Sequence, residues 1–270
     1  MNRLSILDLK KEDKYIIDQR TGDYVLDLSL VKEKAIVEIA KSSKIDLLLV
    51  NAKDNIDLEI NIQEGSYLHL AIFDYSETNS VKINVNVAQN SYFSSYFADF
   101  IPNKCKGEIH VHLNGRQSTC DWHLAALAEK QDNKQFDVNV YHHSPETFAY
   151  LDNYGVCRDK GRLLFSGICH IEKGSRGSIA RQNAKIMVFD ELSNGIAKPI
   201  LKIDENDIQA SHAAVVGKIN DEHIFYLTSR GLTEVEAKRI ITLGYLKPIL
   251  AGFKDEDIKR QIEDVIEGKM

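Results

Sequence analysis

A short phrase of alternating apolar and polar residues returns several times along this chain, and each copy ends in a turn. The early copies begin about 23 to 26 residues apart, a period typical of proteins built from stacked structural repeats. Alternation with period 2 indicates a β-strand, and the Ser, Gly and Asn residues that follow favour a turn. The repeats therefore predict a coil of stacked parallel strands. The copies are residues 37–43, 60–66 and 85–91, a looser copy at 111–115 and a later one at 169–175.

The same alternating pattern extends from about Asp23 to about Ile203, without a helix of normal length inside it. Strands that alternate with helices would indicate a doubly wound sheet, so this class is excluded. A β-sandwich or a closed barrel remains the competing architecture, and Asn114-Gly115 and Asn194-Gly195 are hairpin signals that suit it. Shared phrasing at a fixed period favours the solenoid.

From Asn220 the pattern changes to helix. Asp221 is placed to cap a short helix that Gly231 would end, and Gly244 would end a second helix. That second helix begins with a capping box, in which Thr233 and Glu236 satisfy each other's backbone donors.

After Pro248 a last amphipathic helix carries one apolar stripe, formed by Ile258, Ile262, Val265 and Ile266. We therefore expect two units, a β-solenoid over residues 1–219 and a short helical segment over residues 220–270. The helical segment is too short to bury itself fully, so it either caps the end of the solenoid or presents a helical surface to a partner.

Composition narrows the function classes. The formal charge of −6 over 270 residues, without a basic run, argues against nucleic acid or an anionic membrane as partner. The first residues hold no apolar segment long enough for a signal peptide or a membrane span, which predicts a cytoplasmic protein. The four cysteines are scattered and are expected to be free thiols, without a permanent zinc or iron–sulfur site. They are Cys105, Cys120, Cys157 and Cys169.

Residues 167–246 resemble the SufB/SufD family, the scaffold subunits of the Suf machinery that builds iron–sulfur clusters. The resemblance is carried by ordered motifs, namely Gly174-Ser175, Arg181-Gln182-Asn183, Lys-Pro-Ile-Leu-Lys-Ile at 198–203, Ser-His-Ala-Ala-Val-Val-Gly-Lys-Ile at 211–219 and Ile-Phe-Tyr-Leu-Thr-Ser-Arg-Gly-Leu at 224–232. It implies a right-handed parallel β-helix followed by a C-terminal helical segment, in agreement with the repeats.

The resemblance also implies a function. Members of the family catalyse no bond-making themselves. Their C-terminal helices dock the ABC-type ATPase SufC, and the end of the β-helix pairs SufB with SufD or SufD with itself. A transient iron–sulfur cluster then forms at the subunit interface, and no permanently bound cofactor is expected.

This chain departs from the family pattern at several positions. Because the repeats begin almost at once, we expect this chain to lack the large N-terminal helical region of full-length members. Ala184 falls near the cluster-building cysteine of SufB, Ala213 replaces a glutamate of SufB, and Ala210 replaces a cysteine that is frequent in SufD. The chain is therefore similar to SufD and poor in cluster ligands. A stand-alone minimal scaffold homodimer stays open as an alternative, as does the participation of a flavin.

The resemblance assigns candidate residues to three roles. His212 matches the interface histidine of SufD and is the candidate for cluster assembly and for metal ligation, although a histidine that only stabilises the last coil fits equally well. The residues expected to border the interface beside it are Arg181, Gln182, Asn183 and Ser211. The residues expected to dock the ATPase are Tyr226, Leu227, Arg230, Gly231, Leu232 and Glu236, for which ordinary helix packing is the alternative.

Two further readings come from the residues alone. His110 and His112 share one face of a strand and, with Cys120 and His123, could form a metal site, although an exposed ladder is the more ordinary outcome. Polysaccharide-cleaving enzymes also use parallel β-helices, with acidic residues along one strand face. The acidic candidates, Asp137, Glu146 and Asp152, form no repeated row here.

Overall fold

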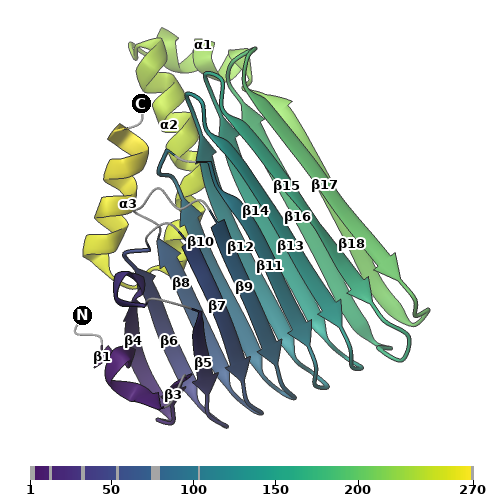
Figure 1. Ribbon diagram of the computed structural model, residues 1–270. Helices are drawn as coiled ribbons and strands as arrows, with labels where there is room; N and C mark the ends of the chain where they lie inside the picture. The colour runs from purple at the N-terminus through teal and green to yellow at the C-terminus, as the bar shows by residue number, and fades with distance from the viewer. Residues whose placement is uncertain are drawn as a thin grey trace.

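The computed structural model describes residues 4–11, 14–31, 34–52, 55–73, 80–102 and 104–268. Within them the chain forms a parallel β-solenoid, in which two sheets enclose one apolar interior and helices follow at the C-terminal side (Figure 1). Successive strands alternate between the sheets, so neighbours within a sheet are two elements apart in the chain. Among the described strands only β2 and β3 pair antiparallel. The parallel pairing of the other described strands confirms the solenoid and rules out the sandwich and the barrel.

Each sheet has nine strands in the described residues. Sheet A contains β1 (Leu4–Ser5), β4 (Thr21–Asp27), β6 (Lys44–Val50), β8 (Tyr67–Phe73), β10 (Tyr92–Asp99), β12 (Thr119–Ala128), β14 (Phe148–Cys157), β16 (Ser178–Val188) and β18 (Ile208–Lys218). Sheet B contains β2 (Lys10–Lys11), β3 (Lys14–Ile17), β5 (Ala35–Ile39), β7 (Asn55–Ile62), β9 (Ser80–Val87), β11 (Lys106–Leu113), β13 (Asn133–His142), β15 (Arg162–Ile171) and β17 (Asn194–Ile203). The helical elements are η1 (Ile6–Leu9), η2 (Leu28–Leu30), α1 (Asp221–Ser229), α2 (Glu234–Leu246), η3 (Lys247–Gly252) and α3 (Glu256–Gly268).

The copies of the repeated phrase begin in strands of sheet B, and their spacing sets the register between those strands. Equivalent apolar residues of successive copies pair directly and point into the interior, where all but the last, Leu201, are buried. Because side chains alternate along a strand, this register keeps one face apolar in every coil. The ladder runs through Val37, Ile60, Val85, Val111, Val140, Cys169 and Leu201.

The turn that closes each copy has its own repeat. The residue before the serine that recurs in these turns adopts a positive φ, as at Gly65 (70°) and Asn90 (55°). Glycine and asparagine tolerate this left-handed conformation better than other residues. The serine that follows is buried, and the Ser66 hydroxyl donates to the Ala40 carbonyl at 2.7 Å while accepting from the Ser43 amide at 3.2 Å. These hydrogen bonds join one turn to the next.

The two hairpin signals mark other features. Gly115 lies in the turn between β11 and β12, where an added Cβ would sit 2.0 Å from the Gln89 backbone nitrogen. Glycine is therefore needed for close stacking of turns, not for a hairpin. Gly195 lies inside the parallel strand β17.

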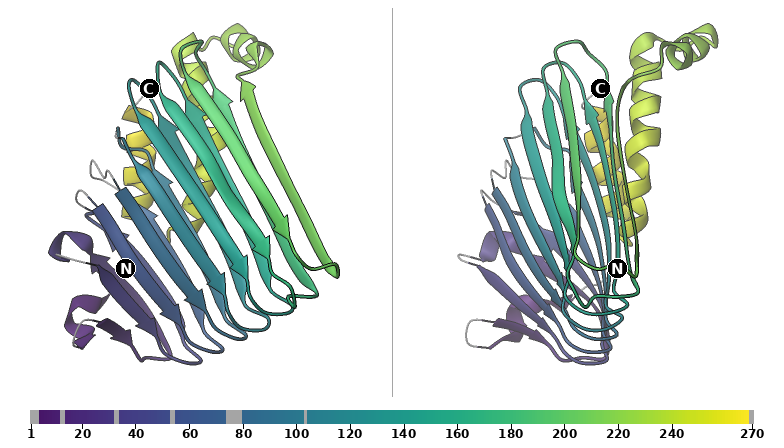
Figure 2. Two further views of the ribbon diagram at one scale, coloured as in Figure 1. Left: turned by 45° about the vertical axis from the view of Figure 1, so that its right-hand side comes forward. Right: turned by 90° about the vertical axis from the view of Figure 1, so that its right-hand side faces the viewer.

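The helical segment packs along the outer face of sheet A, with α1 projecting away from the sheets (Figure 2). A second apolar core forms there, and this placement excludes a cap on the solenoid end. Its residues are Leu48, Ala71, Phe73, Ala98, Phe100, Ala125, Leu127 and Val156 from the sheet, and Leu246, Ile249, Leu250, Phe253, Ile262 and Ile266 from the helical segment.

The helix boundaries differ in part from the sequence prediction. Asn220, not Asp221, is the N-cap of α1, because its side-chain oxygen accepts from the Glu222 amide at 2.8 Å. The capping box of α2 is confirmed. Gly244 does not end α2, which continues to Leu246, where packing on sheet A outweighs the low helix propensity of glycine.

Candidate functional site

The C-terminal end of the solenoid is uncovered in the described residues. β17 and β18 are the last strands of the two sheets, so one edge of each has no strand partner. Apolar side chains on them are exposed, including Ile200 (49%), Val215 (53%) and Val216 (44%). Long edge strands with exposed apolar side chains readily pair with another chain.

His212 lies on this last coil and faces the interior side of sheet A. Its strand partner in register is Gln182 of β16, which is buried at 2% exposure. The Gln182 amide nitrogen donates to the Gly167 carbonyl on sheet B at 3.2 Å, so this side chain crosses the interior just beneath His212. His212 itself is exposed because no further coil follows. An imidazole is therefore presented at the mouth of the solenoid.

The other residues expected at the interface face outward. Arg181, in register with Ser211, places its guanidinium 5.9 Å from the centre of the Tyr150 ring. The Asn183 amide donates to Asp152 at 2.9 Å. Thus only Gln182 shares a face with His212, while Arg181, Asn183 and Ser211 line the outer surface of sheet A next to the edge.

The alanines and thiols also have defined places. By register, Ala184 and Ala210 face the interior with His212, whereas Ala213 faces outward with Asn183. All four cysteines are buried. Burial raises the pKa of Cys157 and of Cys169 to about 12, and it also raises the pKa of Cys120 well above its usual value. These three thiols stay protonated at neutral pH, so they are poor nucleophiles and poor metal ligands.

The α1 helix exposes more apolar surface than its length can sustain alone. None of its nine residues is buried, and Phe225 and Tyr226 are 73% and 56% exposed. The Arg230 guanidinium lies 5.2 Å from the centre of the Tyr226 ring. Isolated helices this short are unstable in water, so the exposed face is suited to a partner. The sequence reading included Tyr226 and Arg230 but missed Phe225, although the adjacent aromatic pair was a usable signal.

The remaining docking candidates have local structural roles. Gly231 has a φ of 96° directly after the C-cap of α1, which a glycine adopts most easily. The Glu236 carboxylate accepts from the Thr233 amide at 2.7 Å within the capping box. Leu227 and Leu232 are half-buried where α1 meets α2.

The metal site suggested by His110, His112, Cys120 and His123 is not formed. Cys120 points into the core, and His123 stacks on Tyr96 on the outer face of sheet A. His110 and His112 lie on the outer face of sheet B, where they stack on Tyr141 as a half-buried ladder. Burial lowers the pKa of His112, and the neighbouring His143 adds to this effect. Among the described residues no three potential ligands converge on one point.

Comparison with known proteins places the chain in a family. Residues 26–245 match the family model described as "SUF system FeS cluster assembly, SufBD core domain". The chain belongs to the SufB/SufD family. It is 32% identical over 163 residues to the iron-sulfur cluster assembly protein SufD of Bacillus subtilis, covering 60% of this chain and 37% of that protein.

Two further relatives define how far the similarity extends. The SufD protein of Escherichia coli is 28% identical over 154 residues, which cover 56% of this chain and 36% of that protein. The SufB protein of Bacillus subtilis is 22% identical over 261 residues, covering 94% of this chain and 56% of that protein. The identity is thus higher to SufD, and the chain spans between about a third and a little over half of these relatives. No helix in the described residues is long and apolar enough to cross a membrane.

Proposed function

We propose that this SufB/SufD-family chain is a scaffold for iron–sulfur cluster assembly that catalyses no bond-making of its own. It pairs through the uncovered last coil with a SufB-like chain or with a second copy of itself, and it holds a SufC-type ABC ATPase through α1 and the start of α2. The observation that carries this proposal is an open solenoid end with exposed apolar edge strands, in a chain matched by the family model.

Cluster formation would take place where the two solenoid ends meet. His212 is exposed at that end and would become enclosed when another coil covers β18. A neutral imidazole is a competent iron ligand, so His212 would contribute one ligand to the cluster as it forms. The buried thiols described above are poorly placed for this role, and the partner chain would supply further ligands. The cluster is cargo of the complex and not a resident cofactor.

A carbohydrate-cleaving enzyme is disfavoured by the geometry. The Asp137 carboxylate accepts from Ser166 on sheet B, and Asp152 accepts from Asn183 on sheet A. Glu146 forms an ion pair with Arg116 in a turn. These carboxylates lie in three separate places and form no pair across a shared cleft, which glycosidic cleavage requires.

Reversing the charge at α1 should weaken capture of the ATPase. We expect Arg230→Glu to raise the dissociation constant about 30-fold, the size of a loss at an interface hot spot of about 2 kcal/mol. Surface plasmon resonance with the purified ATPase measures it. Arg260→Glu makes the same charge change on α3 at a side chain that is 74% exposed and should bind normally. Equal binding by both variants would refute α1 as the docking surface.

Removing the imidazole should reduce cluster formation without affecting the fold. We expect His212→Ala to bind the ATPase normally but to lower the yield of iron and acid-labile sulfide about tenfold in anaerobic reconstitution. Gln209→Ala changes an exposed residue on the outward side of the same strand and should leave the yield intact. An unchanged yield for His212→Ala would remove this residue from the mechanism.

A further inference from the structure

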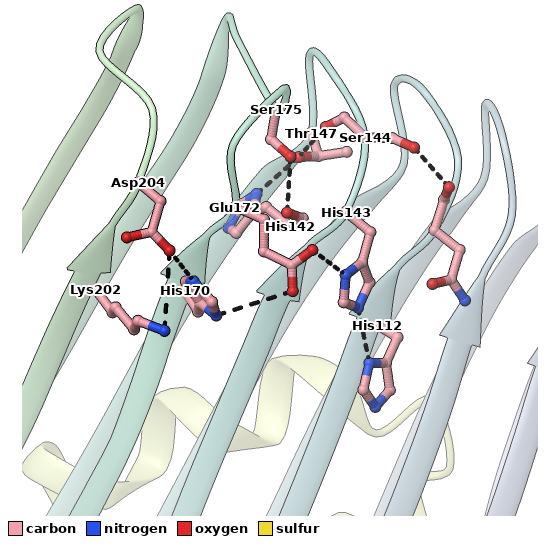
Figure 3. A network of polar contacts seen from close by, with 11 residues as sticks. His112, His142, His143, Ser144, Thr147, His170, Glu172, Ser175, Lys202 and Asp204 are labelled. Atoms are coloured by element: carbon pink, nitrogen blue, oxygen red, sulfur yellow. Dashed lines mark hydrogen bonds and ion pairs between the residues drawn. The ribbon is translucent and has the colours of Figure 1, made fainter.

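A second group of histidines lies on the outer surface of sheet B, away from the inward face that carries His212. Figure 3 shows His112 of β11, His143 just after β13, His170 near the end of β15 and Glu172 just after it, in a row across neighbouring coils. His112 Nδ1 lies 3.0 Å from His143 Nε2, and His143 Nδ1 lies 2.9 Å from the Glu172 carboxylate. The side chains of His143 and Glu172 are 28% and 40% exposed, so solutes reach them.

The carboxylate fixes which nitrogen of His143 carries its proton. Ionised Glu172 can only accept hydrogen bonds, so His143 Nδ1 carries the proton and donates it. His143 Nε2 then bears a lone pair directed toward His112. This carboxylate–imidazole arrangement is the one that commonly orients histidine ligands of metal ions. The 3.0 Å contact then assigns a proton to His112 Nδ1, which donates to that lone pair.

A second imidazole lies beside the carboxylate. The other Glu172 oxygen lies 3.9 Å from His170 Nδ1, and His170 Nε2 lies 2.7 Å from the Asp204 carboxylate. Glu172 thus lies between two imidazoles at the turn edge of the sheet.

The distance between the two ring nitrogens suits one shared ion. Two ligands that each bind a metal at about 2.0–2.1 Å stand about 2.9–3.4 Å apart, depending on the coordination angle. The observed 3.0 Å falls within this range. The rings are nearly parallel, at 8°, so ion binding needs the His112 proton to move from Nδ1 to Nε2 and both side chains to rotate slightly, which directs the two free nitrogens toward the ion. Neutral imidazole is the form of histidine that binds metal ions.

We propose that His112 and His143 form an open two-histidine site for a divalent transition-metal ion of the zinc, nickel and copper class, with Glu172 as the positioning residue. Imidazole suits these ions, whereas calcium and magnesium prefer an oxygen environment. Because no third ligand converges among the described residues, water fills the remaining positions. Such a site binds an exchangeable ion at the surface and does not stabilise the fold.

Isothermal titration calorimetry of the metal-free protein with Zn²⁺ alone at pH 7.5 tests the site. We expect one saturable ion per chain that is lost in both His112→Asn and His143→Asn. Glu172→Gln should bind about tenfold more weakly, although it touches no ion, because the orientation of His143 is relaxed. His223→Asn removes an exposed histidine on α1 and should bind as the wild type.

Three results would overturn the proposal: no saturable binding, binding retained in His112→Asn or His143→Asn, or an affinity unchanged in Glu172→Gln. Circular dichroism confirms that each variant is folded. Nitrogen-15 spectra of the wild type give an independent measurement, in which Zn²⁺ should shift the ring nitrogens of His112 and His143 before those of the other histidines. Neither experiment depends on cluster assembly, so the site and the scaffold function stand or fall separately.

Discussion

Replacing Lys134 by alanine is expected to destabilise the solenoid by about 3–5 kcal/mol, because it leaves a buried carboxylate without its counter-ion. Lys134 lies at the start of β13 in sheet B and is fully buried. Its ammonium donates to the Asp99 carboxylate at 2.5 Å and to the Ile101 carbonyl at 2.9 Å. Asp99 ends β10 in sheet A and is also fully buried, so the ion pair joins the two sheets. Urea unfolding at pH 7 measures the loss.

A surface pair supplies the control for this ion pair. Lys106 lies 2.6 Å from Glu108, but its side chain is 67% exposed. Lys106→Ala should therefore leave the unfolding free energy almost unchanged, because an exposed ion pair is screened by solvent. The double variant Lys134→Met with Asp99→Leu should lose less than Lys134→Ala alone, since it leaves no charge unpaired. A loss below about 1 kcal/mol in Lys134→Ala would show that the ion pair does not support the fold.

The second large effect is expected where the helical segment meets sheet A. Phe253 follows η3, is 2% exposed, and packs edge-on against Phe73 with ring centres 6.5 Å apart. Just before it, the Gly252 carbonyl accepts from His69 at 2.6 Å. Phe253→Ala would leave a cavity in this second core and should cost about 3–5 kcal/mol in urea unfolding.

Phe225→Ala is the matched control for this core substitution. Phe225 is 73% exposed on α1, so its removal should leave the unfolding free energy within about 0.5 kcal/mol while weakening capture of the ATPase. Phe253→Ala should thus lower the stability of the fold, whereas Phe225→Ala should affect only the binding of the ATPase. Comparable losses of stability in both variants would contradict the division between a packed helical segment and an exposed docking helix.

The fold could be predicted from the sequence because the spacing of the repeats indicates which residues of neighbouring strands in sheet B pair with one another. Val37, Ile60 and Val85 recur at nearly equal spacing and pair in that order. The later copies were harder to recognise because the strands lengthen from eight residues in β11 to ten in β13 and β15. The longer strands stretch the period, so the register partner Val140 escaped the list of copies.

The placement of the helical segment could not be predicted in the same way. Its apolar stripe on α3 was evident, and Ile262 and Ile266 are indeed buried. The receiving surface was not evident, since outward residues such as Ala71 and Phe73 read as ordinary members of a strand. Which face of the solenoid accepts the helices depends on how distant coils align.

The candidate sites, too, could be predicted only in part from the sequence. Sequence motifs pointed to His212 and to α1, but alternation along a strand was needed to separate Gln182 from its neighbours. The histidine row was missed because its members belong to different coils. His112 and His143 are 31 residues apart in the chain and meet only after the coils stack. His142, next to His143, turns the opposite way and is buried.

Anaerobic reconstitution in the presence of the SufC-type ATPase, and of a SufB-like chain where one is encoded, tests the scaffold account most directly. After supply of iron and sulfide, the isolated complex should carry both in similar amounts and show the visible absorbance of a cluster. The same complex without this chain should carry neither. A complex that assembles a cluster equally well without this chain, or one that never retains iron and sulfide with it, would contradict the account.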